Sequence, residues 1–248
     1  MSLDRYILHP LRAVIDFVLP PRCIGTRDIV DAQGMVSPDF WRELHFITPP
    51  LCNACGLPFG FDMPGEALCG ACLEHEPSFD RARAACAYND ASRKLVLAFK
   101  YGDNLHAINT LVPWMLRAGE GMIAACDIIA PVPLHGRRLR ERKFNQSALL
   151  AAGIAKRSNK LCQLDLLTRT RHTPPQKGLN AKERNLNVKD AFAVKEKLLP
   201  MIKDKTILLV DDVYTTGATL NECAKILKDV GAAHVFVITI ARATKEEL

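Results

Sequence analysis

Residues 206–219 read TILLVDDVYTTGAT, and this stretch decides the fold class of the larger part of the chain. An apolar run from Thr206 to Val210 leads directly into two adjacent aspartates, Asp211 and Asp212. Strands that are apolar on both faces are typical of parallel sheets covered by helices. Ligands of such sheets bind at the carboxyl ends of the strands, so paired carboxylates at this position indicate a binding site.

The loop after the aspartates has the composition of a phosphate-binding turn. Thr215, Thr216 and Thr219 offer hydroxyl groups, and Gly217 lets the backbone approach a ligand closely. Backbone N–H groups at the start of the helix predicted at 218–229 would complete an anion site. A helix cap is the alternative interpretation, but a single carboxylate would suffice for that. A sugar phosphate accounts for both the acids and the loop.

Strands and helices alternate from about residue 80 onwards. The G-x-x-x-x-G-K-[ST] and G-x-G-x-x-G patterns are absent, which argues against a P-loop and a dinucleotide fold. The alternation predicts an α/β fold with a mostly parallel sheet flanked by helices, and a polar loop at 169–190. We expect strands at 82–89, 127–133, 162–168, 191–194, 206–210 and 234–241, and helices beginning near 90 and at 104–118, 145–158 and 218–229.

Four of the nine cysteines form two C-x-x-C pairs, Cys52 with Cys55 and Cys69 with Cys72. Each turn directs two sulfurs at one point, and two turns complete a tetrahedral four-thiolate zinc site. Such a site is closed, so we assign it a structural role. A redox pair and four unrelated buried cysteines are the alternatives.

Cys23 has no C-x-x-C partner, because position 26 is threonine. It is either the remnant of a further knuckle or a small buried hydrophobe. Before it, the apolar residues of segment 7–18 fall at helical spacing and predict a short amphipathic helix, with a peripheral membrane contact as the alternative.

These features divide the chain into three parts. Residues 1–48 comprise the N-terminal helix and a degenerate first zinc knuckle, residues 49–80 a zinc ribbon, and residues 81–248 the α/β domain.

The composition is that of an ordinary soluble protein, with 48% hydrophobic and 24% charged residues among 248. No run is long and apolar enough to span a bilayer. The formal charge of +6 favours anionic ligands, either phosphates or nucleic acid. An odd number of cysteines without a convincing signal peptide predicts a cytoplasmic protein rather than a secreted disulfide framework.

Several stretches resemble the ComF family of competence-associated proteins, which are similar to type I phosphoribosyltransferases. ILLVDDVYTTGAT resembles the motif with which those enzymes bind phosphoribosyl pyrophosphate (PRPP). The resemblance spans residues 20–243 and implies a type I phosphoribosyltransferase fold with a small N-terminal zinc ribbon. The other stretches that carry it are PPLCNACGLPF, LCGACL, AFKYGD, PVPLHGRRLRERKFNQ, RTRHTPPQKGL and ERNLNV.

The resemblance also implies roles for individual residues. Asp211 and Asp212 would hold the ribose hydroxyls and stabilise an oxocarbenium-like transition state, with Mg²⁺ bound mainly by PRPP and water. The 5-phosphate would lie against Thr215, Thr216, Gly217, Ala218 and Thr219. The pyrophosphate would lie near Val132, Pro133, Leu134 and His135, and a flexible loop at 169–190 would add Arg171, Gln176 and Arg184, with Arg171 also a catalytic candidate.

Two positions depart from the family pattern. Cys23 alone survives of a first knuckle, and Lys143 replaces the usual glycine in RKFNQ. The arginine-rich run 137–143 is open to three interpretations: pyrophosphate binding, contact with a nucleic-acid backbone, or a solvated helix face.

Two functions follow from the resemblance. The first is a PRPP-dependent phosphoribosyltransferase with an unknown acceptor. The alternative is a non-catalytic accessory protein of DNA uptake that binds PRPP or a nucleotide and contacts single-stranded DNA or the uptake machinery. Arg171, Gln176 and Arg184 favour catalysis, because a pure binding module does not need them.

Overall fold

The computed structural model describes residues 19–63, 65–101, 106–135, 139, 144–171, 173 and 180–244. The amphipathic helix predicted at 7–18 lies outside these residues. So do Gln176, Lys143 and the arginines of 137–143.

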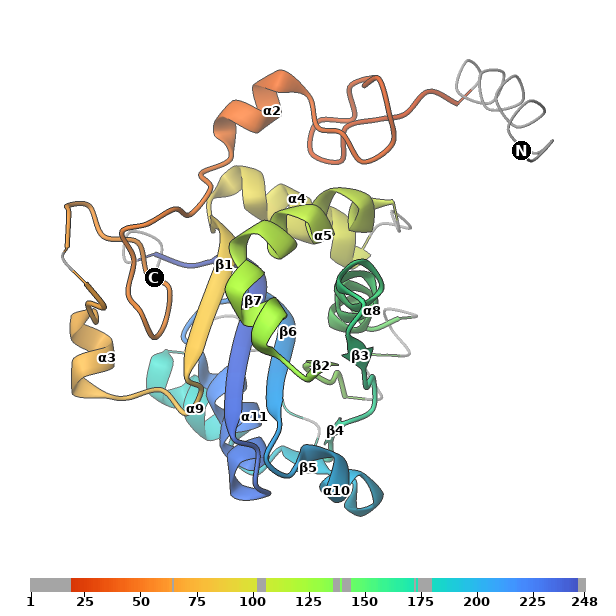
Figure 1. Ribbon diagram of the computed structural model, residues 1–248. Helices are drawn as coiled ribbons and strands as arrows, with labels where there is room; N and C mark the ends of the chain where they lie inside the picture. Colours follow the sequence, from red (N-terminus) through yellow and green to blue (C-terminus); the bar gives the residue numbers. More distant parts are fainter. Residues whose placement is uncertain are drawn as a thin grey trace.

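A five-stranded parallel sheet forms the centre of the molecule, in the order β1-β7-β6-β2-β3 (Figure 1). Each of its inner strands is covered on both faces, which confirms the expected α/β class. The strands are β1 (Arg81–Ala87), β2 (Ile128–Pro131), β3 (Leu161–Cys162), β6 (Thr206–Tyr214) and β7 (His234–Arg242).

The apolar start of β6 is explained by two separate cores. Ile207 and Leu209 point into one core, and Leu208 and Val210 point into the other. All four side chains are fully buried. A strand with water on one face would alternate apolar and polar residues, whereas residues 207–210 are buried on both faces of the sheet.

Helices cover the two faces in separate layers. One face carries α4 (Asp90–Tyr101), α5 (Ala107–Ala118), α6 (Glu120–Ala125) and α8 (Gln146–Ser158). The other carries α9 (Ala181–Val188), α10 (Leu199–Ile202), the short 3₁₀ helix η1 (Glu196–Leu198) and α11 (Ala218–Asp229).

Three differences from the sequence-based expectation concern the strands and the predicted loop. β6 continues through both aspartates as far as Tyr214, because β7 still pairs with it there. The strand expected at 162–168 is split into β3 and β4 (Leu167–Arg169), and β4 pairs antiparallel with β5 (Phe192–Val194) in a small second sheet. Helix α9 occupies part of the segment expected as a loop.

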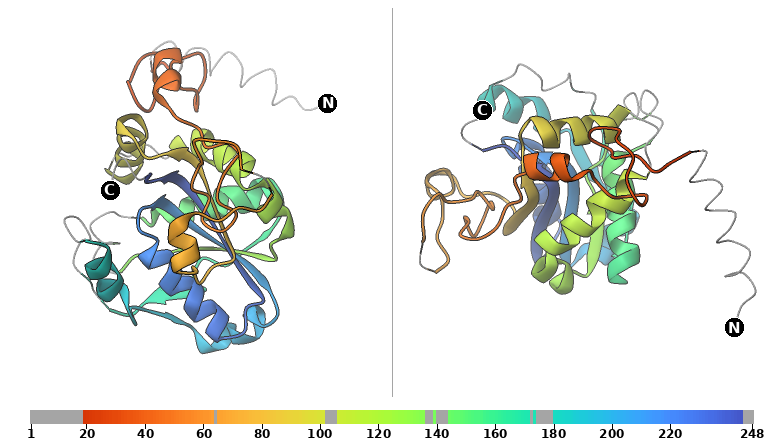
Figure 2. Two further views of the ribbon diagram at one scale, coloured as in Figure 1. Left: turned by 90° about the vertical axis from the view of Figure 1, so that its left-hand side faces the viewer. Right: turned by 90° about the horizontal axis from the view of Figure 1, so that it is seen from above.

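The two segments before β1 join different hydrophobic cores. The N-terminal segment (19–48) contains α2 (Pro38–Glu43) and joins the core that includes α4 and α5; Figure 1 shows it above these two helices. The four-cysteine segment (49–80) contains α3 (Gly70–Glu74) and joins the core under α11. Seen from above in Figure 2, the four-cysteine segment (orange) and the green helices α5 and α8 lie on opposite sides of the strands.

Within the described ranges, no helix has the length and apolar character that a bilayer crossing requires.

Candidate functional site

A pocket of about 210 Å³ lies at the carboxyl ends of β2 and β6. β2 ends at Pro131, opposite Val210, and β6 continues from there through Asp211 and Asp212, so the segment after β2 lies beside the two aspartates. This is where ligands bind in open parallel sheets. The lining residues are Lys100, Val132, Pro133, Leu134, Arg169, Asp211, Asp212, Val213, Thr215, Gly217, Ala218, Thr219 and Leu220.

The two aspartates have different surroundings. Asp211 Oδ1 accepts hydrogen bonds from Ser147 Oγ and from the backbone N–H of Asp212, each at 2.9 Å. Burial raises the pKa of Asp211 above its usual value, and the adjacent Asp212 charge raises it further. Asp212 Oδ2 instead forms an ion pair with Lys100 Nζ at 2.8 Å. One carboxylate is therefore held inside the scaffold and the other faces a cation in the pocket.

Three consecutive residues at the start of α8 fix the geometry of the site. The side-chain amide of Asn145 donates to the carbonyl of Val132 at 3.1 Å, and that of Gln146 donates to the carbonyl of Lys100 at 3.1 Å. Ser147 donates to Asp211. These three side chains connect the start of α8 to the segment after β2, to α4 and to β6. This explains why three consecutive residues here are hydrogen-bond donors.

The loop from Thr215 to Thr219 leads directly into α11. Gly217 is the N-cap residue and has φ +80°, in the left-handed region that favours glycine. A Cβ at Gly217 would lie 2.8 Å from Cε2 of Tyr214, so the ring supports the loop from below. The backbone N–H groups at the start of this 12-residue helix carry its positive dipole end, which makes the loop suited to an anion.

Two cations at the pocket were not among the predicted site residues. Lys100 pairs with Asp212, and Arg169 stacks on the Phe192 ring with its guanidinium carbon 5.1 Å from the centroid. Arg169 also donates to the hydroxyl of Thr173. Both positions fall in stretches that resemble the ComF family, and their place at the pocket depends on long-range packing.

The structure brings most of the predicted ligand-binding residues to the pocket. The exceptions among the described residues are Thr216, whose hydroxyl accepts from the N–H of Ala218 at 3.5 Å, together with His135, Arg171 and Arg184. Arg171 donates to the carbonyls of Asn187 and Lys189 at the end of α9, at 3.2 and 2.7 Å. In this structure Arg171 stabilises a helix end, and the roles proposed for it and Arg184 stay predictions.

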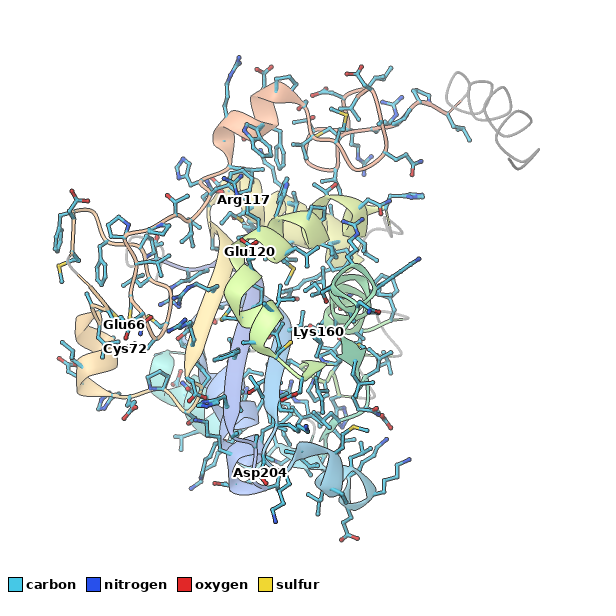
Figure 3. All side chains as sticks on the ribbon, in the orientation of Figure 1. Glu66, Cys72, Arg117, Glu120, Lys160 and Asp204 are labelled. Carbon is cyan, nitrogen blue, oxygen red and sulfur yellow. The ribbon has the colours of Figure 1, made fainter. Side chains whose placement is uncertain are left out.

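The sulfurs of Cys52, Cys55, Cys69 and Cys72 all lie within 4.8 Å of one another. The Cys55–Cys69 pair is 3.6 Å apart, and tetrahedral zinc places its sulfurs about 3.8 Å apart. Cys52 Sγ also accepts backbone N–H groups from Cys55 and Cys69 at 3.5 and 3.3 Å. The four residues fit a closed zinc site, and Figure 3 labels Cys72, which lies within α3.

The equivalent positions of the N-terminal segment hold different groups. The spacing C-x-x-C…C-x-x-C is matched there by Cys23, Thr26, Ser37 and Phe40. Thr26 Oγ1 and Ser37 Oγ are hydrogen-bonded at 3.1 Å, while Cys23 and Phe40 are buried. One sulfur, two hydroxyls and a phenyl ring do not fit zinc. Cys23 is thus a buried residue at the first of these four positions.

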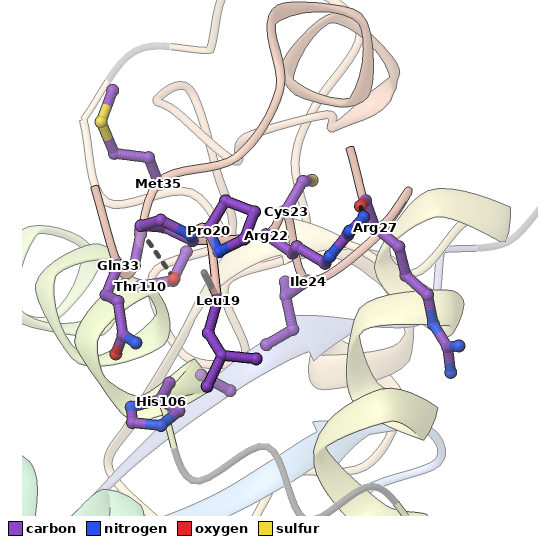
Figure 4. A pocket seen from close by; sticks show the side chains of 13 residues that line it. Leu19, Pro20, Arg22, Cys23, Ile24, Arg27, Gln33, Met35, His106 and Thr110 are labelled. Carbon is purple, nitrogen blue, oxygen red and sulfur yellow. Dashed lines mark hydrogen bonds between the residues drawn. The ribbon is translucent and has the colours of Figure 1, made fainter. Parts of the chain in front are cut away.

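The N-terminal segment rests on the start of α5. The Thr110 hydroxyl donates to the carbonyl of Gly34 at 2.7 Å, marked by a dashed line in Figure 4. Between the two lies a pocket of about 440 Å³, whose labelled lining includes Cys23, Met35 and His106.

The fold and the two sites define a phosphoribosyltransferase-like α/β protein with an N-terminal zinc-ribbon region. Residues 145–248 match the phosphoribosyl transferase domain model, and residues 14–73 match the double zinc ribbon domain model. The four cysteines are accordingly a structural zinc site.

Relatives extend this match across most of the chain, which belongs to the ComF family. Competence protein F of Haemophilus influenzae is 32% identical over 78% of the chain and 85% of its own length. The DNA utilization protein YhgH of Escherichia coli K12 is 34% identical over 77% and 84%. Competence protein ComFC of Bacillus subtilis is 27% identical over 81% of each.

Proposed function

We propose that the pocket binds the ribose 5-phosphate part of PRPP. The observation that carries the proposal is the shared pocket itself, which joins Asp212 and Asp211 to the N–H groups and hydroxyls before α11. The carboxylates match the ribose hydroxyls, and the loop matches a monoester phosphate. Lys100 and Arg169 supply positive charge at the same pocket for the pyrophosphate.

Magnesium would enter with PRPP. Mg²⁺ keeps several waters and binds mainly through phosphate oxygens, so a protein needs to offer it only one or two carboxylates. Asp211 and Asp212 are the carboxylates at the pocket. Asp212 exchanges its Lys100 partner for ribose or metal when the ligand binds.

The proposed reaction is transfer of the phosphoribosyl group to an acceptor with release of pyrophosphate. The bond from C1 to the pyrophosphate oxygen breaks, a nucleophile of the acceptor bonds to C1, and the leaving electrons go to pyrophosphate. The charge of Asp212 would stabilise the positive sugar in the transition state, with a smaller contribution from Asp211, whose pKa is raised by burial.

A non-catalytic role in DNA uptake is the second candidate. It is favoured by the names of the relatives, which refer to competence and DNA utilization. The two candidates share ligand binding and differ in turnover. Release of pyrophosphate from PRPP when nucleobases or amines are added supports transfer. Tight binding of PRPP with no pyrophosphate release for any acceptor tested supports the accessory role.

Calorimetry on the zinc-loaded chain tests the binding proposal. PRPP with Mg²⁺ and ribose 5-phosphate should both bind, and Asp212→Asn should weaken both about 10- to 100-fold, the equivalent of one charged hydrogen bond. Asp127→Asn is the matched control. Asp127 lies at the opposite end of the same strands, where its carboxylate accepts from the N–H of Thr206 at 2.8 Å. Equal affinity of the two variants would reject the site.

A further inference from the structure

Arg242 lies between the zinc site and the phosphate-binding loop. It is the last residue of β7 and is directly opposite Tyr214, the last residue of β6. Its side chain is buried, with 7% of its surface exposed. Two segments far apart in the sequence meet at this one guanidinium group.

On one side the guanidinium contacts the four-cysteine segment. Its Nη1 donates to the carbonyl of Cys55 at 2.8 Å, and its Nη2 donates to Sγ of Cys55 at 3.2 Å. The planar fork of arginine suits two acceptors of one residue. Hydrogen bonds of this kind orient a metal-binding side chain and tune its affinity for the metal.

On the other side the guanidinium lies over the Tyr214 ring, 4.1 Å from the centroid. The same ring packs edge-on against Phe79, with centroids 6.0 Å apart. It also fills the space below Gly217, where an added Cβ would clash at 2.8 Å. The position of Tyr214 therefore determines where the phosphate loop can lie.

The buried charge of Arg242 makes this contact sensitive to the zinc site. A buried cation requires an anionic or hydrogen-bonding partner. Across the described ranges, no carboxylate forms a salt bridge with Arg242, and its Nε has no hydrogen-bond partner. Its acceptor on this side is Cys55 Sγ, which becomes an anionic thiolate when it binds zinc and would then be held in place by the metal.

We propose that Arg242 is a positioning residue that couples zinc occupancy to the phosphate loop. With zinc bound, Cys55 holds Arg242 against Tyr214, and Tyr214 holds Gly217 in its left-handed conformation. Without zinc the two knuckles lose their common centre, Arg242 loses its partner, and the loop loses its support. The effect on ligand affinity rests on the proposed function, whereas the effect on the loop does not.

Hydrogen exchange of peptides covering 214–219 tests the coupling directly. In Arg242→Met, which keeps an apolar stem, exchange of these amides should rise at least about fivefold while exchange in the core of β7 stays unchanged. Zinc content, measured by mass spectrometry, should remain at one per chain. Chelation of the zinc from the natural chain should produce the same rise at 214–219.

Two further variants separate positioning from general destabilisation. Arg83→Met is the control, because Arg83 also contacts the four-cysteine segment, donating to the carbonyl of Asn53 at 3.0 Å, but does not contact Tyr214. Its exchange at 214–219 should match that of the natural chain. Arg242→Lys retains a cationic donor and should restore part of the protection.

The outcomes distinguish this inference from the proposed function. Unchanged exchange at 214–219 in Arg242→Met overturns the coupling, whether or not ligand binds. A rise in exchange throughout the chain also overturns it, because Arg242 would then be only a stabilising residue. Calorimetry then measures the affinity of each variant for ribose 5-phosphate. Arg242→Met should bind it at least about fivefold more weakly than Arg83→Met. No binding by the natural chain rejects the function and leaves the exchange result valid.

Discussion

The two segments before β1 solve the same structural problem in different ways. Each has four side chains at C-x-x-C…C-x-x-C spacing, and each joins a different hydrophobic core. The four-cysteine segment fills these positions with sulfur, whereas the N-terminal segment fills three of them with Thr26, Ser37 and Phe40. A metal concentrates the stabilising free energy in four bonds, and a phenyl ring distributes it over many packing contacts.

This difference has a consequence for function. The packing contacts of Phe40 in the N-terminal segment need no metal. Metal bonds depend on zinc, so the four-cysteine segment can respond to metal supply. In the part of the chain that the structure describes, the four-cysteine segment reaches the candidate site through Arg242 and Tyr214.

The largest expected effect is loss of the metal itself. The double variant Cys52→Ala, Cys69→Ala should reduce zinc content from one per chain to zero, because two ligands cannot hold it. The ribbon should unfold, since binding of a structural zinc contributes roughly 10 kcal/mol or more to folding. Zinc analysis and thermal unfolding measure this.

Cys23→Ala is the corresponding change in the N-terminal segment. It should leave the zinc content at one per chain, and a loss of bound zinc in this variant would show that the first knuckle does bind metal.

The second largest effect is expected at Phe40, whose ring stands at the position that corresponds to Cys72 of the four-cysteine segment. Phe40→Ala should lower the free energy of unfolding by about 3–5 kcal/mol, because the side chain is fully buried and its loss leaves a cavity. Phe61→Ala is the control, since Phe61 is 67% exposed. Denaturant unfolding of both variants measures the difference, and equal stabilities would contradict the packing account.

The smallest effect concerns the hydroxyl pair. A double-mutant cycle of Thr26→Val and Ser37→Ala should give a coupling free energy of about 0.5–1.5 kcal/mol, as expected for one neutral hydrogen bond. Zinc content should not change in any member of the cycle. A coupling near zero would mean that the 3.1 Å contact adds nothing to the knuckle.

Local patterns were sufficient for the parts of the fold that depend on short-range chemistry. The apolar run 207–210 predicts a strand buried on both faces, and the spacing of the cysteines predicts the zinc site. The helix at 218–229 was predicted at its observed limits. Its limits are encoded locally, because Gly217 begins it and the apolar periodicity ends with it.

The errors arise where pairing between distant strands decides the structure. The sequence suggests that a strand ends before two charged residues, but β7 continues to pair with β6 beyond Asp212, and so extends it. Likewise, β4 leaves the main sheet because β5, more than twenty residues away, provides its partner.

By itself, the sequence determined the class of the sheet and the four zinc ligands, and it placed two aspartates and a threonine-glycine loop at the end of one strand, since each of these features lies in neighbouring residues. Tertiary structure alone decided that Lys100 pairs with Asp212, that Ser147 holds Asp211, and that Arg242 joins the zinc site to Tyr214. Ser147 and Asp211 are 64 residues apart in the sequence, and Arg242 and Cys55 are 187 residues apart. Such contacts depend on how helices and strands pack, and no local pattern of residues specifies that packing.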